Sequence, residues 1–154
     1  MKYHSTRLGD FDLQEDEVLQ FADGLYGFER EKRFAVLPFN QEIESPLEWM
    51  QSLQNPDLAF VITDPHLFVA DYKVSFLDHE KAEIELQPDG FCLVRVIVNI
   101  PSIYTEMTAN LVAPIAINPE KNLAKQFILT TVEYDTRHYL FSEEVRKSAA
   151  PGAK

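Results

Sequence analysis

The chain lacks several features that secreted, membrane and redox-active proteins usually have. Cys92 is its only cysteine and its neighbours in the sequence are apolar, which favours a small buried side chain over a nucleophile. No apolar run approaches the roughly 20 residues that span a bilayer, and residues 1–14 lack the apolar core of a signal peptide. We therefore expect a cytoplasmic protein without membrane contact.

Catalytic and cofactor-binding motifs are also missing. The four histidines do not have the spacing of an HExxH motif; they are His4, His66, His79 and His138. The chain contains no GxSxG, P-loop or GxGxxG motif, and Gly24 and Gly27 alone are too few to cradle a phosphate. We expect no cofactor, no metal site and no enzymatic activity.

Negative charge is present in excess. The chain has 25 acidic and 14 basic residues, which give a net charge of -11. Residues 1–90 contain 19 acidic and 7 basic residues and carry -12, whereas residues 91–154 contain 6 and 7 and carry +1. This surplus argues against direct binding of nucleic acid. It fits either solubility alone or an acidic docking face for a basic protein.

The clearest strand pattern covers residues 91–100, which are rich in β-branched side chains. Alternation places four side chains on the face that we expect to meet the core: Cys92, Val94, Val96 and Val98. Arg95 lies on the other face, which must therefore reach an edge or solvent. Residues 111–117 form a second apolar segment, in which Pro114 predicts a bulge, a bend or an edge.

Further short strands alternate with turns, and we expect them at residues 3–8, 10–13, 18–21, 33–39, 58–63 and 124–132, with an extended segment at residues 67–74. About eight short strands with one or two short helices predict a mainly β chain, folded as a single-domain antiparallel β-barrel-like or sandwich structure. This domain should cover residues 1–141. Residues 142–154 have few apolar side chains and should form a frayed helix or a flexible tail.

Two segments show helical signals. Residues 46–54 begin with proline at the first helical position and include a capping box formed by Ser45 and Glu48. Residues 78–86 fit either a short helical turn or a strand, and we expect the helical turn.

Residues 21–29, with the sequence FADGLYGFE, form a glycine-spaced turn. Gly24 and Gly27 flank Leu25 and Tyr26, both of which we expect to be exposed. Glycine permits backbone conformations that other residues avoid, as a tight loop requires. Both a structural turn and a recognition loop fit this segment.

Several segments occur in an order that is characteristic of one family: FADGLYGFE (21–29), LQNPDLAFVITDP (53–65), TANLVAPIAIN (108–118), Lys125-Gln126, and Tyr134 with Arg137-His138. Together they resemble the FliW family of flagellar assembly factors over residues 3–140. The chain departs from the family at Ala22 and Tyr26, where the family often has proline, and in the short segment 78–90.

This resemblance implies a non-enzymatic partner switch. FliW-like proteins bind the translational regulator CsrA and relieve its repression of flagellin mRNA, while flagellin competes for FliW. An acidic domain without a cofactor is compatible with a basic RNA-binding partner, because charge complementarity raises the association rate. The alternative function is a small β-barrel that binds an apolar small molecule.

Candidate partner-binding residues are aromatic or polar groups in turns that a core does not require. They are Tyr26, Phe28, Glu29, Asn55 and Asp57. The competing interpretation places Phe28 in the core and leaves Asn55 only the role of ending a helix.

Overall fold

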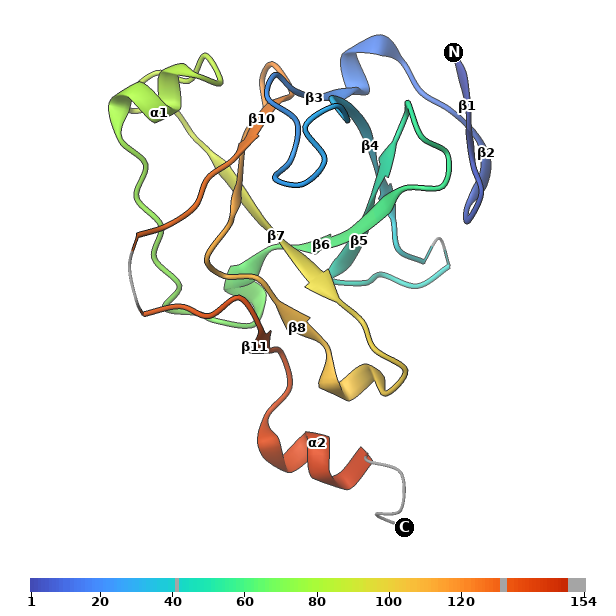
Figure 1. Ribbon diagram of the computed structural model, residues 1–154, viewed down its shortest axis with the longest axis vertical. Coiled ribbons are helices and arrows are strands. Elements are labelled where there is room, and N and C mark those ends of the chain that lie inside the picture. Colours follow the sequence, from blue (N-terminus) through green and yellow to red (C-terminus); the bar gives the residue numbers. More distant parts are fainter. Residues whose placement is uncertain (41, 131–132, 150–154) are drawn as a thin grey trace.

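The computed structural model describes residues 1–40, 42–130 and 133–149 (Figure 1). Its strands are β1 (Lys2–Ser5), β2 (Gly9–Asp12), β3 (Leu19–Phe21), β4 (Arg33–Pro38), β5 (Leu47–Ser52), β6 (Ala59–Thr63), β7 (Leu93–Asn99), β8 (Thr108–Ala109), β9 (Ile115–Asn118), β10 (Leu123–Gln126) and β11 (His138–Tyr139). Its helices are α1 (Asp78–Ala82) and α2 (Glu143–Ala149), with the 3-10 turns η1 (Glu15–Glu17), η2 (Pro65–Leu67) and η3 (Tyr104–Glu106).

Seven strands close into a mixed β-barrel in the order β7, β6, β5, β4, β3, β10 and β9. The barrel closes because β9 pairs back onto β7, with Leu93 opposite Ile117 and Arg95 opposite Ile115. The strands β3 and β10 run parallel, whereas the other barrel neighbours are antiparallel. The predicted mainly β, barrel-like fold with two short helices is therefore confirmed, and one parallel pair departs from the antiparallel expectation.

The sheet continues past the barrel. The second half of β7 pairs with β8, where Val98 is opposite Ala109, and β8 pairs with β11, where Ala109 is opposite His138. Figure 1 shows β8 and β11 below the barrel, followed by α2. The hairpin of β1 and β2 forms a separate two-stranded sheet.

Apolar side chains fill the inside of the barrel. The buried members of this interior cluster are Leu19, Phe21, Leu25, Phe34, Met50, Ile62, Ile115, Ile117 and Ala124. Leu93 and Ile97 of β7 pack against them. Because successive residues of a strand face opposite sides, the neighbouring residues of β7 point outward.

A second cluster covers the outside of β7. Val96 and Val98 pack there with Tyr72, whose hydroxyl donates a hydrogen bond of 2.7 Å to the carbonyl oxygen of Leu111. The chain after β6 thus closes over the outer face of the barrel. The alternation predicted for residues 91–100 is confirmed, and Val96 and Val98 are buried as expected. The expectation that the Arg95 face reaches an edge or solvent is wrong for Leu93 and Ile97, because closure of the barrel turns that face inward.

The helix predicted for residues 46–54 is wrong, because these residues contain β5. This strand pairs with β4 on one side and β6 on the other, and it places Met50 inside the barrel. Two ladders of backbone hydrogen bonds and the burial of Met50 outweigh the local helix signals. The Ser45 hydroxyl accepts a hydrogen bond of 3.1 Å from the Leu47 N–H, and the Glu48 carboxylate pairs with the Arg95 guanidinium at 3.5 Å.

Three other expectations have mixed outcomes. The helical turn predicted in residues 78–86 is confirmed by α1. Residues 67–74 form no strand, because η2 and turns occupy this region. The strand predicted for residues 124–132 ends at Gln126, and residues 131–132 lie outside the described part of the chain.

The C-terminal segment begins with the helix α2. The Arg146 guanidinium carbon lies 3.7 Å from the ring centroid of Tyr139, and its Nε donates a hydrogen bond of 3.3 Å to the carbonyl oxygen of Phe141. Val145 is 41% exposed, so the helix buries little apolar surface. Of the two forms expected for residues 142–154, a helix occupies the first part, and residues 150–154 lie outside the description.

Truncation of Val96, which is fully buried, should destabilise the barrel wall. We expect Val96→Ala to lower the free energy of unfolding by about 1 to 3 kcal/mol, because it leaves a cavity in the outer cluster. Denaturant unfolding measures this change. Val145→Ala is the matched control at an exposed position, and a Val96→Ala effect as small as the control would contradict the assignment.

Removal of residues 142–154 should leave the melting temperature within a few degrees of the full chain, because α2 makes few apolar contacts. Thermal unfolding of this truncation is compared with a shorter truncation that removes only residues 150–154. The difference between the two isolates α2. A loss of many degrees on removing α2 would show that the barrel depends on this helix.

Candidate functional site

One end of the barrel carries the candidate recognition loop. The ends of β3, β5, β7 and β10 lie together at this end because β3 runs parallel to β10 and antiparallel to β4. Residues 22–32 connect β3 to β4 there, and residues 53–58 connect β5 to β6. The two connections therefore lie side by side.

Glycine is required where the loop turns. Gly24 has a φ of +66°, and a Cβ at this position would lie 2.5 Å from the carbonyl oxygen of Glu29. The turn directs Leu25 into the barrel, where it is 1% exposed, so the expectation that Leu25 is exposed is wrong. Tyr26 is 56% exposed, as expected.

A buried amide holds the loop on the barrel. The Tyr26 N–H donates a hydrogen bond of 2.9 Å to Oε1 of Gln126, and Nε2 of Gln126 donates one of 3.2 Å to the carbonyl oxygen of Ala113. Gln126 is itself buried on β10. The backbone of the loop is thus fixed while the Tyr26 ring remains available to a partner.

Phe28 and Glu29 complete the loop. The Phe28 ring packs edge-on against Phe60 at a centroid distance of 5.2 Å and is 42% exposed, so it is neither a core residue nor fully free. The Glu29 carboxylate accepts a hydrogen bond of 2.7 Å from the Gly27 N–H. The structure brings Tyr26, Phe28 and Glu29 together on one loop.

Asn55 and Asp57 lie in the neighbouring turn, where both side chains already have partners. Oδ1 of Asn55 accepts a hydrogen bond of 3.0 Å from the Asp57 N–H, and the Asp57 carboxylate accepts one from the Thr6 hydroxyl. The Thr6 N–H donates to the carbonyl oxygen of Pro56 at 2.9 Å. These contacts tie the turn to the hairpin of β1 and β2, and Asn55 ends no helix.

A charged cluster fixes the first part of the loop. Nζ of Lys125 lies 2.7 Å from Oδ2 of Asp23 and 3.2 Å from Oε1 of Glu83. The hydrogen bond and positive charge of Lys125 hold the pKa of Asp23 below its ordinary value of 3.8. The hydrogen bond to Asp23 in turn raises the pKa of Lys125. The cluster joins the loop to β10 and to the chain after α1.

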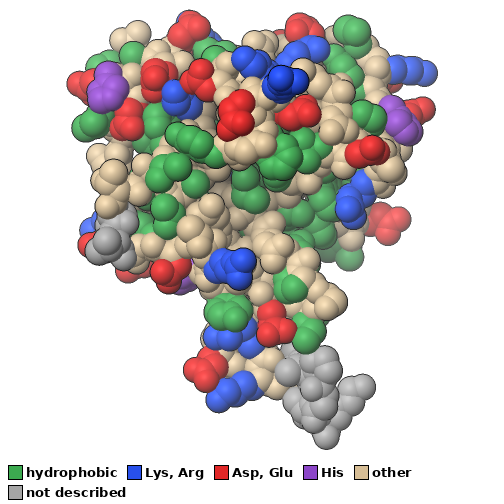
Figure 2. Space-filling view, in the orientation of Figure 1, with side chains coloured by type: hydrophobic (Ala, Val, Ile, Leu, Met, Phe, Trp, Pro, Cys, Tyr) green, Lys and Arg blue, Asp and Glu red, His purple; other side chains and the backbone are tan. Residues whose placement is uncertain are grey.

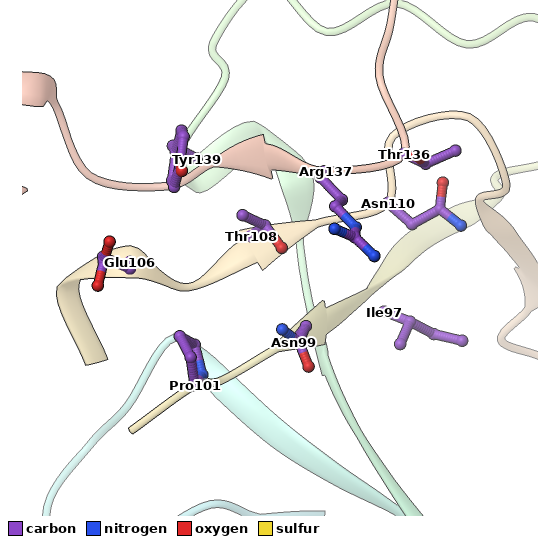
Figure 3. Close-up of a pocket in the computed structure, with 9 residues that line it drawn as sticks. All are labelled: Ile97, Asn99, Pro101, Glu106, Thr108, Asn110, Thr136, Arg137 and Tyr139. Atoms are coloured by element: carbon purple, nitrogen blue, oxygen red, sulfur yellow. The ribbon is translucent and has the colours of Figure 1, made fainter. Parts of the chain in front are cut away.

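The structure also shows a groove that sequence reasoning missed. It has a volume of about 580 Å³, lies on β7, β8 and β11, and has Asn99, Thr108 and Arg137 in its lining (Figure 3). The strands β8 and β11 contain two residues each, too few for an alternation pattern to reveal them. The sequence analysis noted Arg137 only in the Arg137-His138 segment of the family pattern, which gave no sign of a groove.

Within the described ranges, no group of three or more His, Cys, Asp and Glu side chains is placed to hold a metal. Neither helix in those ranges has the length and apolar content needed to cross a bilayer.

Comparisons with known proteins agree on one family. The family described as FliW protein matches residues 2–140. The chain is 36% identical to the flagellar assembly factor FliW of Desulfitobacterium hafniense (strain Y51) over 154 residues, covering 100% of both chains. It is 39% identical to that of Syntrophotalea carbinolica over 135 residues, covering 88% of this chain and 94% of the relative. A crystal structure of the flagellar assembly factor FliW is similar with a TM-score of 0.83 and 32% identity, covering 94% of this chain and 99% of that one.

The ion pair between Asp23 and Lys125 should contribute stability that depends on pH. Because the pKa of Asp23 is lowered in the folded state, this contribution is present above the ordinary value of 3.8 and is lost as pH falls through the folded value. We expect the stability difference between wild type and Asp23→Asn to be largest near neutral pH and to vanish in acid.

Urea unfolding between pH 2 and 7 measures this difference. The same substitution in a Lys125→Met background is the control, because the partner charge is then absent. If Asp23→Asn changes the free energy of unfolding with the same pH dependence in the Lys125→Met background, Lys125 is not the cause of that dependence.

Proposed function

Since this chain belongs to the FliW family of flagellar assembly factors, we propose that it is a non-enzymatic cytoplasmic antagonist of the translational regulator CsrA. By binding CsrA it relieves repression of flagellin mRNA, and flagellin competes with CsrA for it. The match over the full length of a curated relative carries this proposal, because it includes every strand of the barrel.

Packing inside the barrel favours this function over the binding of an apolar small molecule. Phe34, Met50 and Ile115 are fully buried there, and Leu25 enters from the loop. A ligand-binding barrel needs interior volume, which these side chains occupy. Recognition is therefore assigned to the outer surface.

The partner-binding surface that we propose is centred on Tyr26 and Phe28. Exposed aromatic side chains on a fixed backbone lose little conformational entropy on binding, and such residues often dominate interfaces. Glu29 lies in the same loop. Asn55 and Asp57 form the adjoining rim, where their internal hydrogen bonds leave them a supporting role.

Acidic side chains supply the second element of the proposal. Figure 2 shows hydrophobic side chains gathered across the middle of one face, below a band rich in acidic and basic side chains. Docked on CsrA, acidic residues from positions 1–90 would repel RNA phosphates. Only charges close to the RNA path can act this way, because the Debye length is about 8 Å at physiological salt.

The acidic turn η1 contains one carboxylate whose charge can be removed without breaking a contact. Glu15 pairs with the Arg33 guanidinium at 3.1 Å, and Oε1 of Glu17 accepts a hydrogen bond of 3.0 Å from the Gln14 N–H. The exposed Asp16 carboxylate has no hydrogen-bond or ion-pair partner among the described residues. Asp16→Asn therefore changes charge with least effect on the fold.

The test measures the affinity of CsrA for flagellin leader RNA, with and without saturating protein, at two salt concentrations. Wild type should weaken RNA binding, most strongly at low salt, and added flagellin should restore it. Tyr26→Ala should weaken CsrA binding on the order of tenfold. Phe91→Ala is its control, because Phe91 is a 72% exposed aromatic residue before the opposite end of β7.

Two results would contradict the proposal. Full RNA affinity of CsrA in the presence of saturating wild type at low salt would exclude antagonism. If Asp16→Asn and other charge-neutralising variants bind CsrA and antagonise RNA as well as wild type does, steric or conformational exclusion replaces electrostatic repulsion.

A further inference from the structure

The groove on β7, β8 and β11 contains several hydrogen-bond donors without partners. Among the described residues, the Arg137 guanidinium, the Asn99 amide and the Thr108 hydroxyl have no hydrogen-bond or ion-pair partner. Asn110 uses its Oδ1 to accept a hydrogen bond of 3.1 Å from the Val112 N–H, which leaves its amide N–H groups free. Four donor groups from three chain segments therefore line one groove.

Figure 3 shows how these side chains lie. Arg137 extends over the groove, with Asn110 on one side and Asn99 of β7 on the other, while Glu106 lies at the far end. Among the described residues that line the groove, Glu106 is the only acidic one. The end that contains Arg137 thus offers donors and a positive charge that forms no ion pair among the described residues.

Arg137 differs in this respect from Arg33, Arg95 and Arg146, and shares with the exposed Arg30 the lack of a hydrogen-bond or ion-pair partner among the described residues. Arg33 pairs with Glu15, Arg95 pairs with Glu48, and Arg146 packs on the Tyr139 ring. In a chain with a net charge of -11, internal carboxylates are abundant, yet Arg137 contacts none among the described residues. An unpaired guanidinium surrounded by amide and hydroxyl groups has the donor set that binds a carboxylate.

The groove is continuous with the proposed partner-binding surface. Ile97 and Asn99 also line an adjoining depression that includes Phe60, the residue against which Phe28 packs. A polypeptide bound at Phe28 can therefore continue over β7 into the groove. A small anion would occupy only the Arg137 end.

We propose that this groove binds an acidic side chain on a polypeptide segment of flagellin and thereby separates flagellin from CsrA. The inference rests on the proposed function, which supplies these two partners. CsrA binds RNA through a basic surface, so an arginine groove offers that surface repulsion rather than complementarity. In this proposal the acidic residues of positions 1–90 attract CsrA, and the groove that contains Arg137 selects the other partner.

The test compares dissociation constants of purified flagellin and CsrA for wild type and Arg137→Gln. We expect Arg137→Gln to weaken flagellin binding about tenfold, through faster dissociation, and to leave CsrA binding unchanged. Arg137→Lys keeps the charge but loses bidentate geometry and should cost about threefold. Lys2→Gln, at an exposed lysine outside the groove with no side-chain partner in the described chain, makes the same charge change and should have no effect.

Short overlapping flagellin peptides with blocked termini then locate the acidic residue. For the peptide that binds, changing its Asp or Glu to the amide should weaken binding to wild type but not further weaken binding to Arg137→Gln. If Arg137→Gln binds flagellin as tightly as wild type does, the groove assignment is wrong and the proposed function still stands. The same holds if Arg137→Gln loses affinity for flagellin and CsrA equally. Wild type that binds no flagellin refutes the proposed function instead.

Discussion

The pairing of β7 with three other strands is the constraint on which the structure depends. Along one edge it pairs with β6, and along the other it pairs first with β9 and then with β8. Backbone groups on a buried strand must find partners, so this division decides where the barrel closes and where the sheet continues outside it. Both the packed interior of the barrel and the groove outside it result from this division of the β7 pairing.

Buried amide side chains hold the surface loops in place. Nε2 of Gln51 donates hydrogen bonds of 3.0 Å to the carbonyl oxygens of Ser52 and Leu58, and its Oε1 accepts one of 2.7 Å from the Ser5 hydroxyl. Gln126 has the same role for the loop that carries Tyr26. A buried amide left without partners is costly, so each satisfied amide fixes the segments it joins.

In the function that we propose, recognition is divided between chemically different surfaces of one barrel. The aromatic loop at the barrel end offers apolar contact, and the groove offers a cation with amide and hydroxyl donors. The acidic residues of positions 1–90 would act at longer range, and salt screens their effect. A switch between two partners requires differences of this kind, because a uniform surface cannot discriminate between them.

The sequence by itself determined the mainly β class, the strand at residues 91–100, the glycine turn and the order of segments that marks the family. Each depends on neighbours in the chain, through side-chain alternation or a backbone angle that only glycine tolerates well. Of the five candidate residues, the sequence pointed to the exposed Tyr26 and the half-exposed Phe28, because both lie in this local glycine turn. Tertiary structure alone decided that residues 47–52 form a strand, that Leu25 turns inward and that Arg137 lies beside Asn99. These outcomes depend on pairing between residues far apart in the chain, where ladder hydrogen bonds and core burial outweigh local propensity.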